Sequence, residues 1–202
     1  MHLRSDMEKY PIVLDLETQK LFSEIDRSKR HLLRVSLVGI YDYREKNYFT
    51  FEEKEISKLE SFLRNASFLI GFNIRDFDLE VLKPYLISSL DDIPVLDLLE
   101  EIERVRKHKV SLQSVAQATL KEGKSGSGLE AVQLFREGRM EELKQYCLDD
   151  VRITKALYEY GKSAGKVYFL SNRDWQVHEV SVKWGENEPT AAGEKTFPST
   201  LF

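Results

Sequence analysis

The sequence has almost no cysteine and no long apolar run, and both absences limit what the chain can be. Its 202 residues include one cysteine, Cys147, so an internal disulfide is impossible and a zinc site built from several cysteines is excluded. No stretch is long enough to cross a membrane. Residues 1–9 have no apolar run behind them that could serve as a signal peptide. We therefore expect a cytoplasmic protein that makes no use of a membrane.

An excess of positive charge is also missing. Lys and Arg together number 30 against 34 Asp and Glu, which gives a net charge of −4 and a pI near 5.7. A strongly basic nucleic-acid binder is therefore excluded, whereas an enzyme that holds a strand end through metal ions and a local basic patch is not. The apolar content of 42% is ordinary for a globular protein, and this length predicts a single domain with a sizeable core.

Three apolar stretches predict strands in the first quarter of the chain. They are Ile12–Leu14, which is continuously apolar, followed by His31–Tyr43 and Asn47–Phe51, which alternate. Short connections between sequential strands favour an antiparallel meander. The polar segment Gln19–Arg30 between the first two strands is predicted to be a loop with room for one helical turn.

Strands and helices then alternate along the chain. Helical spacing of apolar residues predicts helices at Lys54–Arg64 and Asp78–Leu86, and short buried runs predict strands at Ser67–Phe72 and Ile93–Leu96. Strands connected by helices are usually parallel. We therefore expect a mixed α/β sheet of five strands, flanked by helices.

From Asp97 onward the pattern predicts helices and then a hairpin. The predicted helices are Asp97–Arg106, Ser111–Leu120, Leu129–Glu137 and Met140–Tyr160, with Ser111 and Ser127 as N-caps, a flexible connector at Gly123–Gly128 and hairpin strands at Lys166–Leu170 and Val177–Val182. We accordingly divide the chain into an amino-terminal extension (1–9), one α/β domain (10–165), a hairpin packed on that domain (166–184) and a disordered tail (185–202).

Two acids directly follow the first apolar run. Asp15 and Glu17 are two residues apart, so on a strand their carboxylates lie on the same face. Paired carboxylates repel unless a cation lies between them, and oxygen ligands favour Mg²⁺ or Mn²⁺ over zinc. The pair alone is weak evidence, because acids are also common at the solvated ends of strands.

Three further residues have both a functional and a structural interpretation. Asp78 follows a predicted strand and opens a helix, where it could bind a ligand or cap the helix. Tyr146 and Asp150 are one helical turn apart, so their side chains can contact the same ligand. Tyr146 alone could also be an ordinary core tyrosine. Asp149 points about 100° away from Asp150 on the helix and is predicted to lie in solvent beside Arg152.

In this order the residues resemble the three motifs of the DEDD exonuclease superfamily. The motifs are Asp15-x-Glu17, Asn73-x-x-x-Phe77-Asp78 and Tyr146-x-x-x-Asp150. The tyrosine is typical of the DEDDy branch, because the histidine branch would need a histidine where this chain has Gln145. The chain most resembles YprB-like exonucleases and, next, the proofreading domain of family B DNA polymerases, over roughly Tyr10–Tyr160.

The resemblance implies an RNase H-like fold and a specific chemistry. Asp15, Glu17, Asp78 and Asp150 would hold two divalent cations, Mg²⁺ or Mn²⁺, which activate a water and stabilise the departing 3′ oxygen. A phenol with a pKa of about 10 is a poor general base at neutral pH, so Tyr146 would orient that water. Thr18 would bind the substrate as part of the terminal nucleotide's pocket, and Glu17 would also contact the terminal 3′-hydroxyl. Asn73 and Phe77 would either bind the substrate in the cleft or support the residues that do.

The expected activity is that of a 3′-to-5′ exonuclease. Its substrate would be the 3′ end of a single strand, DNA in preference to RNA, and its products nucleoside 5′-monophosphates. The basic run Arg104–Lys109 either follows the strand's backbone or is a solvated helix end. Two alternatives stay open, namely an exoribonuclease and a non-catalytic nucleic-acid-binding module of a larger complex. We expect a monomer, and the sequence indicates no protein partner.

Overall fold

The fold is known from a computed structural model that describes residues 9–26, 28–123 and 128–185. The predicted extension over 1–9 and the predicted tail over 185–202 fall almost entirely outside these residues. The predicted cap at Ser127 and most of the connector at Gly123–Gly128 lie outside them as well. Within the described part of the chain, no helix is long and apolar enough to cross a membrane.

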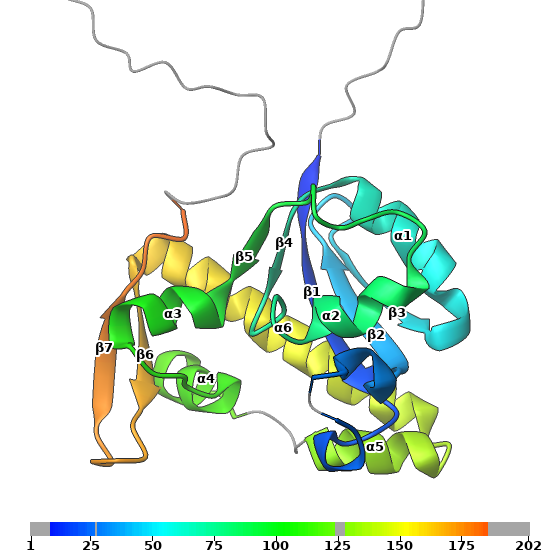
Figure 1. Ribbon diagram of the computed structural model, residues 1–202. Coiled ribbons are helices and arrows are strands. Elements are labelled where there is room, and N and C mark those ends of the chain that lie inside the picture. The colour runs from blue at the N-terminus through cyan, green and yellow to red at the C-terminus, as the bar shows by residue number, and fades with distance from the viewer. Residues whose placement is uncertain (1–8, 27, 124–127, 186–202) are drawn as a thin grey trace, which may run out of the picture.

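A mixed five-stranded sheet forms the centre of the molecule (Figure 1). In spatial order its strands are β3 (Asn47–Glu52), β2 (Val35–Asp42), β1 (Tyr10–Thr18), β4 (Ala66–Gly71) and β5 (Val95–Asp97). The first three sequential strands pair antiparallel, and β4 pairs parallel with both β1 and β5. The predicted meander, the parallel half and the α/β class are therefore confirmed, and the arrangement is RNase H-like.

Helices cover the two faces of the sheet and a hairpin follows them (Figure 1). The helices are α1 (Ile56–Arg64), α2 (Asp78–Leu82), α3 (Leu98–Arg106), α4 (Leu112–Leu120), α5 (Gly128–Arg136) and α6 (Met140–Ala164), and the hairpin strands are β6 (Lys166–Leu170) and β7 (Val177–Ser181). Ser111 caps α4 as predicted, because its hydroxyl accepts a hydrogen bond from the Ser114 N–H. The helix α6 continues past the predicted Tyr160 to Ala164 and is capped by Gly165, whose φ of +67° suits glycine.

Two of the predicted boundaries are wrong for a clear structural reason. The strand predicted at His31–Tyr43 begins only at Val35, because Arg30–Leu33 forms a 3₁₀ turn and Arg34 has a φ of +57°. The helix predicted at Asp78–Leu86 ends at Leu82 and continues as a 3₁₀ turn over Lys83–Tyr85. Pro84 explains the second difference, because a proline cannot donate the backbone hydrogen bond that a continuing α-helix needs.

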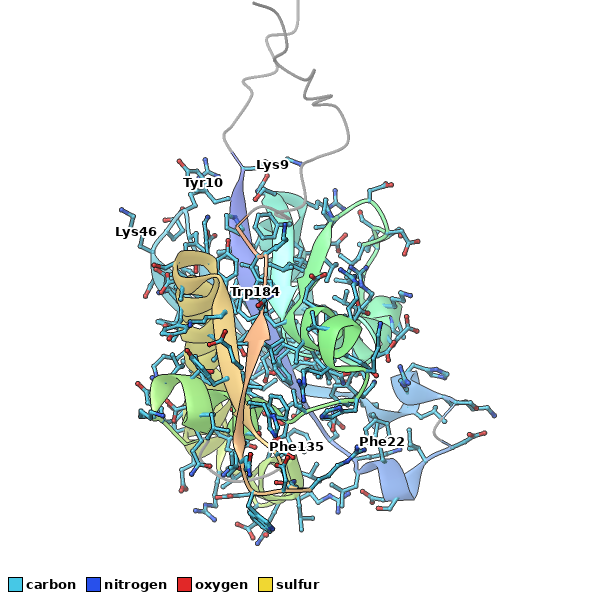
Figure 2. All side chains as sticks on the ribbon, turned by 90° about the vertical axis from the view of Figure 1, so that its left-hand side faces the viewer. Lys9, Tyr10, Phe22, Lys46, Phe135 and Trp184 are labelled. Atoms are coloured by element: carbon cyan, nitrogen blue, oxygen red, sulfur yellow. The ribbon has the colours of Figure 1, made fainter. Side chains whose placement is uncertain are left out.

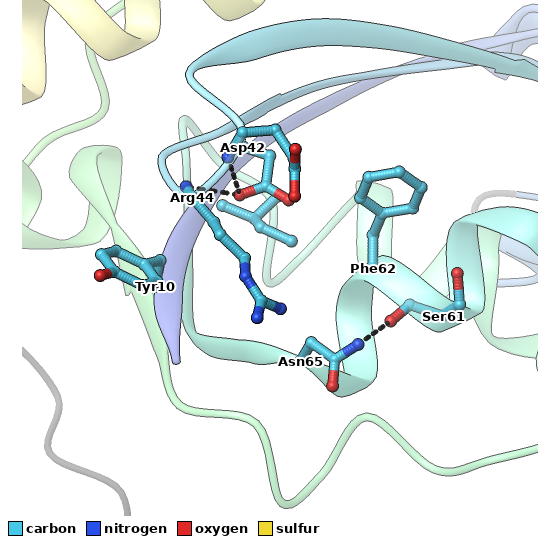
Figure 3. A pocket seen from close by; sticks show the side chains of 8 residues that line it. Tyr10, Asp42, Arg44, Ser61, Phe62 and Asn65 are labelled. Atoms are coloured by element: carbon cyan, nitrogen blue, oxygen red, sulfur yellow. Dashed lines mark hydrogen bonds between the residues drawn. The ribbon is translucent and has the colours of Figure 1, made fainter. Parts of the chain in front are cut away.

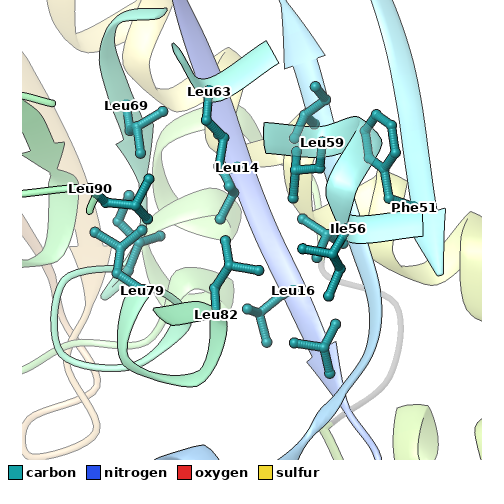
Figure 4. Close-up of a cluster of buried hydrophobic side chains, with 14 of the residues drawn as sticks. Leu14, Leu16, Phe51, Ile56, Leu59, Leu63, Leu69, Leu79, Leu82 and Leu90 are labelled. Carbon is teal, nitrogen blue, oxygen red and sulfur yellow. The ribbon is translucent and has the colours of Figure 1, made fainter. Parts of the chain in front are cut away.

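Alternation along β1 divides the core between the two faces of the sheet. Leu14 and Leu16 pack with α1 and α2 in one cluster, which Figure 4 shows. Val13 belongs to a second cluster on the other face, together with Val151 and Leu157 of α6. Residues of β1 that share a face with Val13 therefore face α6.

The hairpin is fastened to the domain by side chains. The Thr119 hydroxyl of α4 donates to the Tyr168 carbonyl and accepts from the Tyr168 N–H, each at 2.8 Å. Trp184, just past β7, is fully buried (Figure 2). Its ring lies against Gly161 of α6, where an added Cβ would come within 2.3 Å of the indole. Only glycine therefore allows this contact.

Candidate active site

The acids of β1 lie on the strand face that α6 covers. Asp15 and Glu17 alternate with the core residue Leu16 and pair in register with Gly39 and Leu37 of β2. A Cβ at Gly39 would lie 2.8 Å from the Cys147 sulfur of α6, so the glycine allows α6 to approach the sheet closely. The Cys147 thiol in turn donates to the Asp15 carbonyl at 3.7 Å.

One face of α6 supplies the tyrosine and the third acid. Tyr146 and Asp150 are buried, with 5% and 2% of their surface exposed. Their neighbours Cys147 and Val151 pack into the core beneath the sheet. Asp149 lies off this face, half-buried, with its carboxylate 3.6 Å from the Arg152 guanidinium. The predicted pairing of Asp149 with Arg152 is thus confirmed, whereas the prediction that Asp149 lies in solvent holds only in part.

Asp78 is tied to β1 instead of capping its own helix. The N-cap position of α2 is Phe77, which has no capping side chain, and the Asp78 carboxylate accepts the Leu16 N–H at 2.9 Å. This is possible because β1 and β4 pair only as far as Val13 and Ile70 and then separate. Asp78 therefore lies beside the strand segment that carries the first two acids.

The electrostatics around Asp78 are unusual for a carboxyl group. Burial raises the pKa of Asp78 well above its usual range, although the hydrogen bond from the Leu16 N–H opposes this shift. The negative charges of Asp97 and Asp150 raise the pKa of Asp78 further. Acids crowded in this way favour either a shared proton or a bound cation.

A single cleft of about 230 Å³ brings the predicted residues together. The side chains that line it include the five predicted catalytic residues Asp15, Glu17, Asp78, Tyr146 and Asp150. The cleft also has an aromatic wall, formed by Phe22, Phe72 and Phe77. The Phe22 and Phe77 rings lie 5.4 Å apart, and Phe22 is 40% exposed (Figure 2). The cleft thus combines an acidic side with an aromatic side.

The donor set of the cleft fits a hard divalent cation. One carboxylate oxygen each of Asp15 and Glu17 and the Cys147 sulfur all lie within 4.8 Å of one another. Burial, followed by the charges of Asp15 and Glu17, raises the pKa of the Cys147 thiol well above its usual range. Oxygen ligands favour hard cations such as Mg²⁺ or Mn²⁺, which bind sulfur poorly, so the two carboxylates are the expected ligands.

Of the three residues predicted to contact the substrate, two line the cleft and one does not. Thr18 and Phe77 line the cleft, and the Thr18 hydroxyl donates to the Lys20 carbonyl at 2.8 Å. Asn73 is not among the residues that line it; its φ is +67° and its N–H donates to the Asp97 carboxylate at 2.8 Å. The substrate roles of all three stay predictions.

Asp97 is a buried acid near the cleft that the sequence pattern did not single out. It ends β5, caps α3 and is 2% exposed. Its carboxylate accepts from the N–H groups of Asn73, Arg75, Leu99 and Glu100, at distances of 2.8, 3.0, 3.0 and 3.4 Å. It thereby fixes the loop that leads to Asp78. An acid between a short strand and a helix was the available signal, but it gave no hint of the contacts to Asn73 and Arg75.

A second pocket, at the opposite end of the sheet, is less suited to the chemistry. It lies beside Tyr10 and Asn65, at the amino ends of β1 and β4 (Figure 3). The carboxylate of Asp42 in its wall is engaged by the Arg44 N–H at 2.7 Å. Ligands of open α/β sheets usually bind at the carboxyl ends of the parallel strands, where the acidic cleft lies.

Comparison with known proteins supports this interpretation of the fold. A search of curated protein sequences gives no significant match. Residues 12–161, however, match a family model of the RNase_H superfamily. The matched segment contains the five-stranded sheet except for the first two residues of β1, together with all four carboxylates of the cleft and Tyr146. The chain therefore belongs to the RNase H superfamily.

Proposed function

We propose that this protein is a metal-dependent 3′-to-5′ exonuclease of the DEDDy type that acts on single-stranded nucleic acid, with DNA preferred. The superfamily in general hydrolyses nucleic acids with the help of divalent metals. The observation that carries the narrower proposal is that Asp15, Glu17, Asp78, Asp150 and Tyr146 all line one cleft. A tyrosine one helical turn from the last acid is the feature that distinguishes this branch.

The four carboxylates would hold two divalent cations. When bound, these ions supply the activation of a water and the stabilisation of the leaving 3′ oxygen. Asp78 and Asp150 are almost completely buried, so their positions are set before a ligand arrives. The Tyr146 hydroxyl then orients the attacking water, as a hydrogen-bonding group and not as a base.

The remaining walls of the cleft would position the terminal nucleotide. Glu17 would accept a hydrogen bond from the 3′-hydroxyl, next to Thr18 at the carboxyl end of β1. Bases stack well on aromatic rings irrespective of sequence, and the paired rings of Phe22 and Phe77 provide such a surface. Asn73 would act on the substrate from the adjoining loop.

Digestion of labelled oligonucleotides tests the proposal. Single-stranded DNA and RNA of equal sequence, labelled at the 5′ end, would be incubated with Mg²⁺, with Mn²⁺ and with EDTA. We expect a ladder that shortens from the 3′ end, only with metal, and faster for DNA. Faster digestion of RNA would identify an exoribonuclease. The absence of products under every condition would contradict catalysis and favour the non-catalytic binding module.

A further inference from the structure

A larger pocket lies between the hairpin and the start of α4. Its volume is about 380 Å³, within the usual size range of sites for small ligands. One wall is the segment from His108 to Ser114, and the other runs from Phe169 to Arg173. The hairpin that completes this pocket follows residue 161, where the match to the superfamily ends. One wall of the pocket therefore lies inside the matched segment and the other lies beyond it.

Hydrogen bonds and ring contacts hold the two walls together. The Ser114 hydroxyl donates to the Leu170 carbonyl at 2.7 Å, beside the hydrogen bonds between Thr119 and Tyr168. The His108 ring meets the Phe169 ring edge-on at 5.7 Å, and the Arg106 guanidinium lies 5.2 Å from the Phe169 ring centre. Because both ends of the interface are fixed, the pocket does not need a ligand in order to form.

The charge of this pocket is opposite to that of the acidic cleft. His108, Lys109 and Arg173 line it, and none of the described residues that line it is acidic. Arg173 is exposed and forms no ion pair within the described part of the chain. The neighbouring acid, Asp174, is engaged by His178 at 2.8 Å. In a chain with a net charge of −4, two cationic side chains, Lys109 and Arg173, in a lining without acids favour an anionic ligand.

The basic pocket adjoins the acidic cleft. The Lys109 ammonium lies 3.4 Å from the Asp76 carboxylate, and Asp76 is two residues from Asp78, a span of at most about 7 Å. The carboxyl end of β1 and the turn of the hairpin lie at the same, lower end of the molecule in Figure 1. At that turn Trp175 is 76% exposed, which leaves its ring available for stacking on a base.

We propose that this pocket binds the phosphodiester backbone of the substrate strand upstream of the 3′ terminus held in the cleft. Lys109 and Arg173 would contact phosphates, and Trp175 would stack on a base of the same strand. The assignment rests on the proposed function for its biological meaning. Binding of a single strand at the pocket, however, requires no metal and can be tested separately.

The first experiment measures binding with EDTA present, so that no cleavage occurs. A fluorescent single strand of about 12 nucleotides, within the site sizes of roughly 4–16 nucleotides known for single-strand binders, would be titrated at several salt concentrations. We expect Arg173→Gln and Lys109→Gln to weaken binding by about twofold to fivefold each, as for exposed ion pairs. Each should reduce the slope of log K against log salt by about 0.7.

The matched control is Lys46→Gln. Lys46 is exposed in the turn between β2 and β3, far from both sites (Figure 2), and its substitution removes the same charge. If Lys46→Gln and Arg173→Gln weakened binding of the strand equally, the loss of affinity would come from the change in net charge alone, and the proposal would be overturned. Inorganic phosphate and a polyglutamate peptide serve as competitors. Displacement of the strand by either at an equal concentration of negative charge would also overturn it, in favour of free phosphate or an acidic protein.

The second experiment separates this proposal from the proposed exonuclease activity. With metal present, kcat/KM would be compared on a dinucleotide and on the 12-nucleotide strand. We expect Arg173→Gln to lower kcat/KM more on the longer strand, through KM. Equal losses on both substrates would overturn the upstream site and leave the exonuclease intact. If no substrate is cleaved, the proposed exonuclease activity is wrong. The binding experiment would still test whether the pocket binds a single strand.

Discussion

Asp150 and Asp149 are adjacent in the sequence but differ sharply in their surroundings. Asp150 is buried in the cleft, whereas Asp149 is half-buried and pairs with Arg152. We expect Asp150→Ala to lower the rate of cleavage by orders of magnitude, because one ligand for the cations is lost. Tyr146→Phe should leave residual activity, since the carboxylates remain.

The control for these variants is Asp149→Ala, which should cleave at nearly the original rate. Initial rates on labelled single-stranded DNA would be measured for all three variants, with circular dichroism to verify folding. Wild-type turnover by a folded Asp150→Ala would disprove the site assignment.

Asp97 should matter for stability as well as for activity. Asp97→Ala leaves the buried N–H group of Leu99 and the partly buried N–H group of Asn73 without their acceptor. Loss of a cap costs about 0.5–2 kcal/mol, and each unsatisfied buried donor costs about 1–3 kcal/mol. We expect a lower free energy of unfolding by roughly these amounts in urea denaturation. Asp97→Asn keeps one acceptor oxygen and should lose less; equal losses for both variants would contradict this account.

For single residues, the sequence predicted which side chains share a face of a strand or helix better than it predicted contacts between distant segments. Asp15 and Glu17 could be predicted to share a face because a strand alternates, and Tyr146 and Asp150 because a helix repeats. The contact between Asp78 and the Leu16 N–H could not be predicted, because it depends on how far β1 and β4 stay paired. The nearness of Phe22 to Phe77 depends on the path of a loop, which has no periodic pattern.

The helix α1 is joined to a later loop through one buried acid. The Glu60 carboxylate pairs with Arg64 at 2.9 Å and accepts the N–H groups of Ser88 and Ile87 at 2.9 and 3.3 Å. These contacts, led by the hydrogen bond from Arg64, lower the pKa of Glu60 to about 2 from an ordinary 4.5. The ionised carboxylate therefore stabilises the fold above pH 4.5, and this stabilisation is lost as the pH falls toward 2.

We accordingly expect Glu60→Gln to unfold more easily than the original chain at pH 7. The difference should shrink steadily as the pH falls from about 4.5 to about 2, because both chains are then uncharged at this position. Urea denaturation of both chains at several pH values would measure it. Ser61 is exposed in the same helix, so Ser61→Ala provides a control whose effect should not vary with pH. A Glu60→Gln difference that stayed constant down to pH 2 would refute this prediction.

Elements were predictable where their periodicity is long and uninterrupted. The helix α6 has a strong apolar face and was placed correctly at its start, whereas its end was missed by four residues because Gly161 packs inside the helix and does not end it. His31–Arg34 was wrongly included in β2 because Leu33 is buried by a 3₁₀ turn, which gives the same apolar signal as a strand. Local patterns do not distinguish these cases.

The molecule as a whole should be stabilised by the cations it is proposed to bind. Four carboxylates around one cleft repel each other in the folded state, and a ligand that binds only this state stabilises it. At about 100 times its Kd the gain is about 2.7 kcal/mol, or roughly 5–10 °C in Tm for a chain of this length.

Thermal melts with Mn²⁺, Mg²⁺ and EDTA measure this shift. Asp15→Asn should abolish most of it, while Cys147→Ala should keep it, because Mg²⁺ and Mn²⁺ prefer oxygen ligands to sulfur. A metal-dependent shift that disappeared in a folded Cys147→Ala would make the thiol a ligand after all. The experiment needs no substrate, so it tests the metal site independently of catalysis.

The two tryptophans of the chain provide two intrinsic fluorescence signals in different surroundings. Trp184 is sealed against Gly161, whereas Trp175 is open to solvent at the hairpin turn. Indole fluorescence shifts to longer wavelength in water, so the emission maximum of Trp175 should lie at longer wavelength than that of Trp184. Iodide should quench only the fluorescence of Trp175. A single strand that stacks on Trp175 would quench only the long-wavelength emission. Unfolding would shift the emission of Trp184 to longer wavelength. Ligand binding and loss of structure can thus be followed in one unlabelled sample.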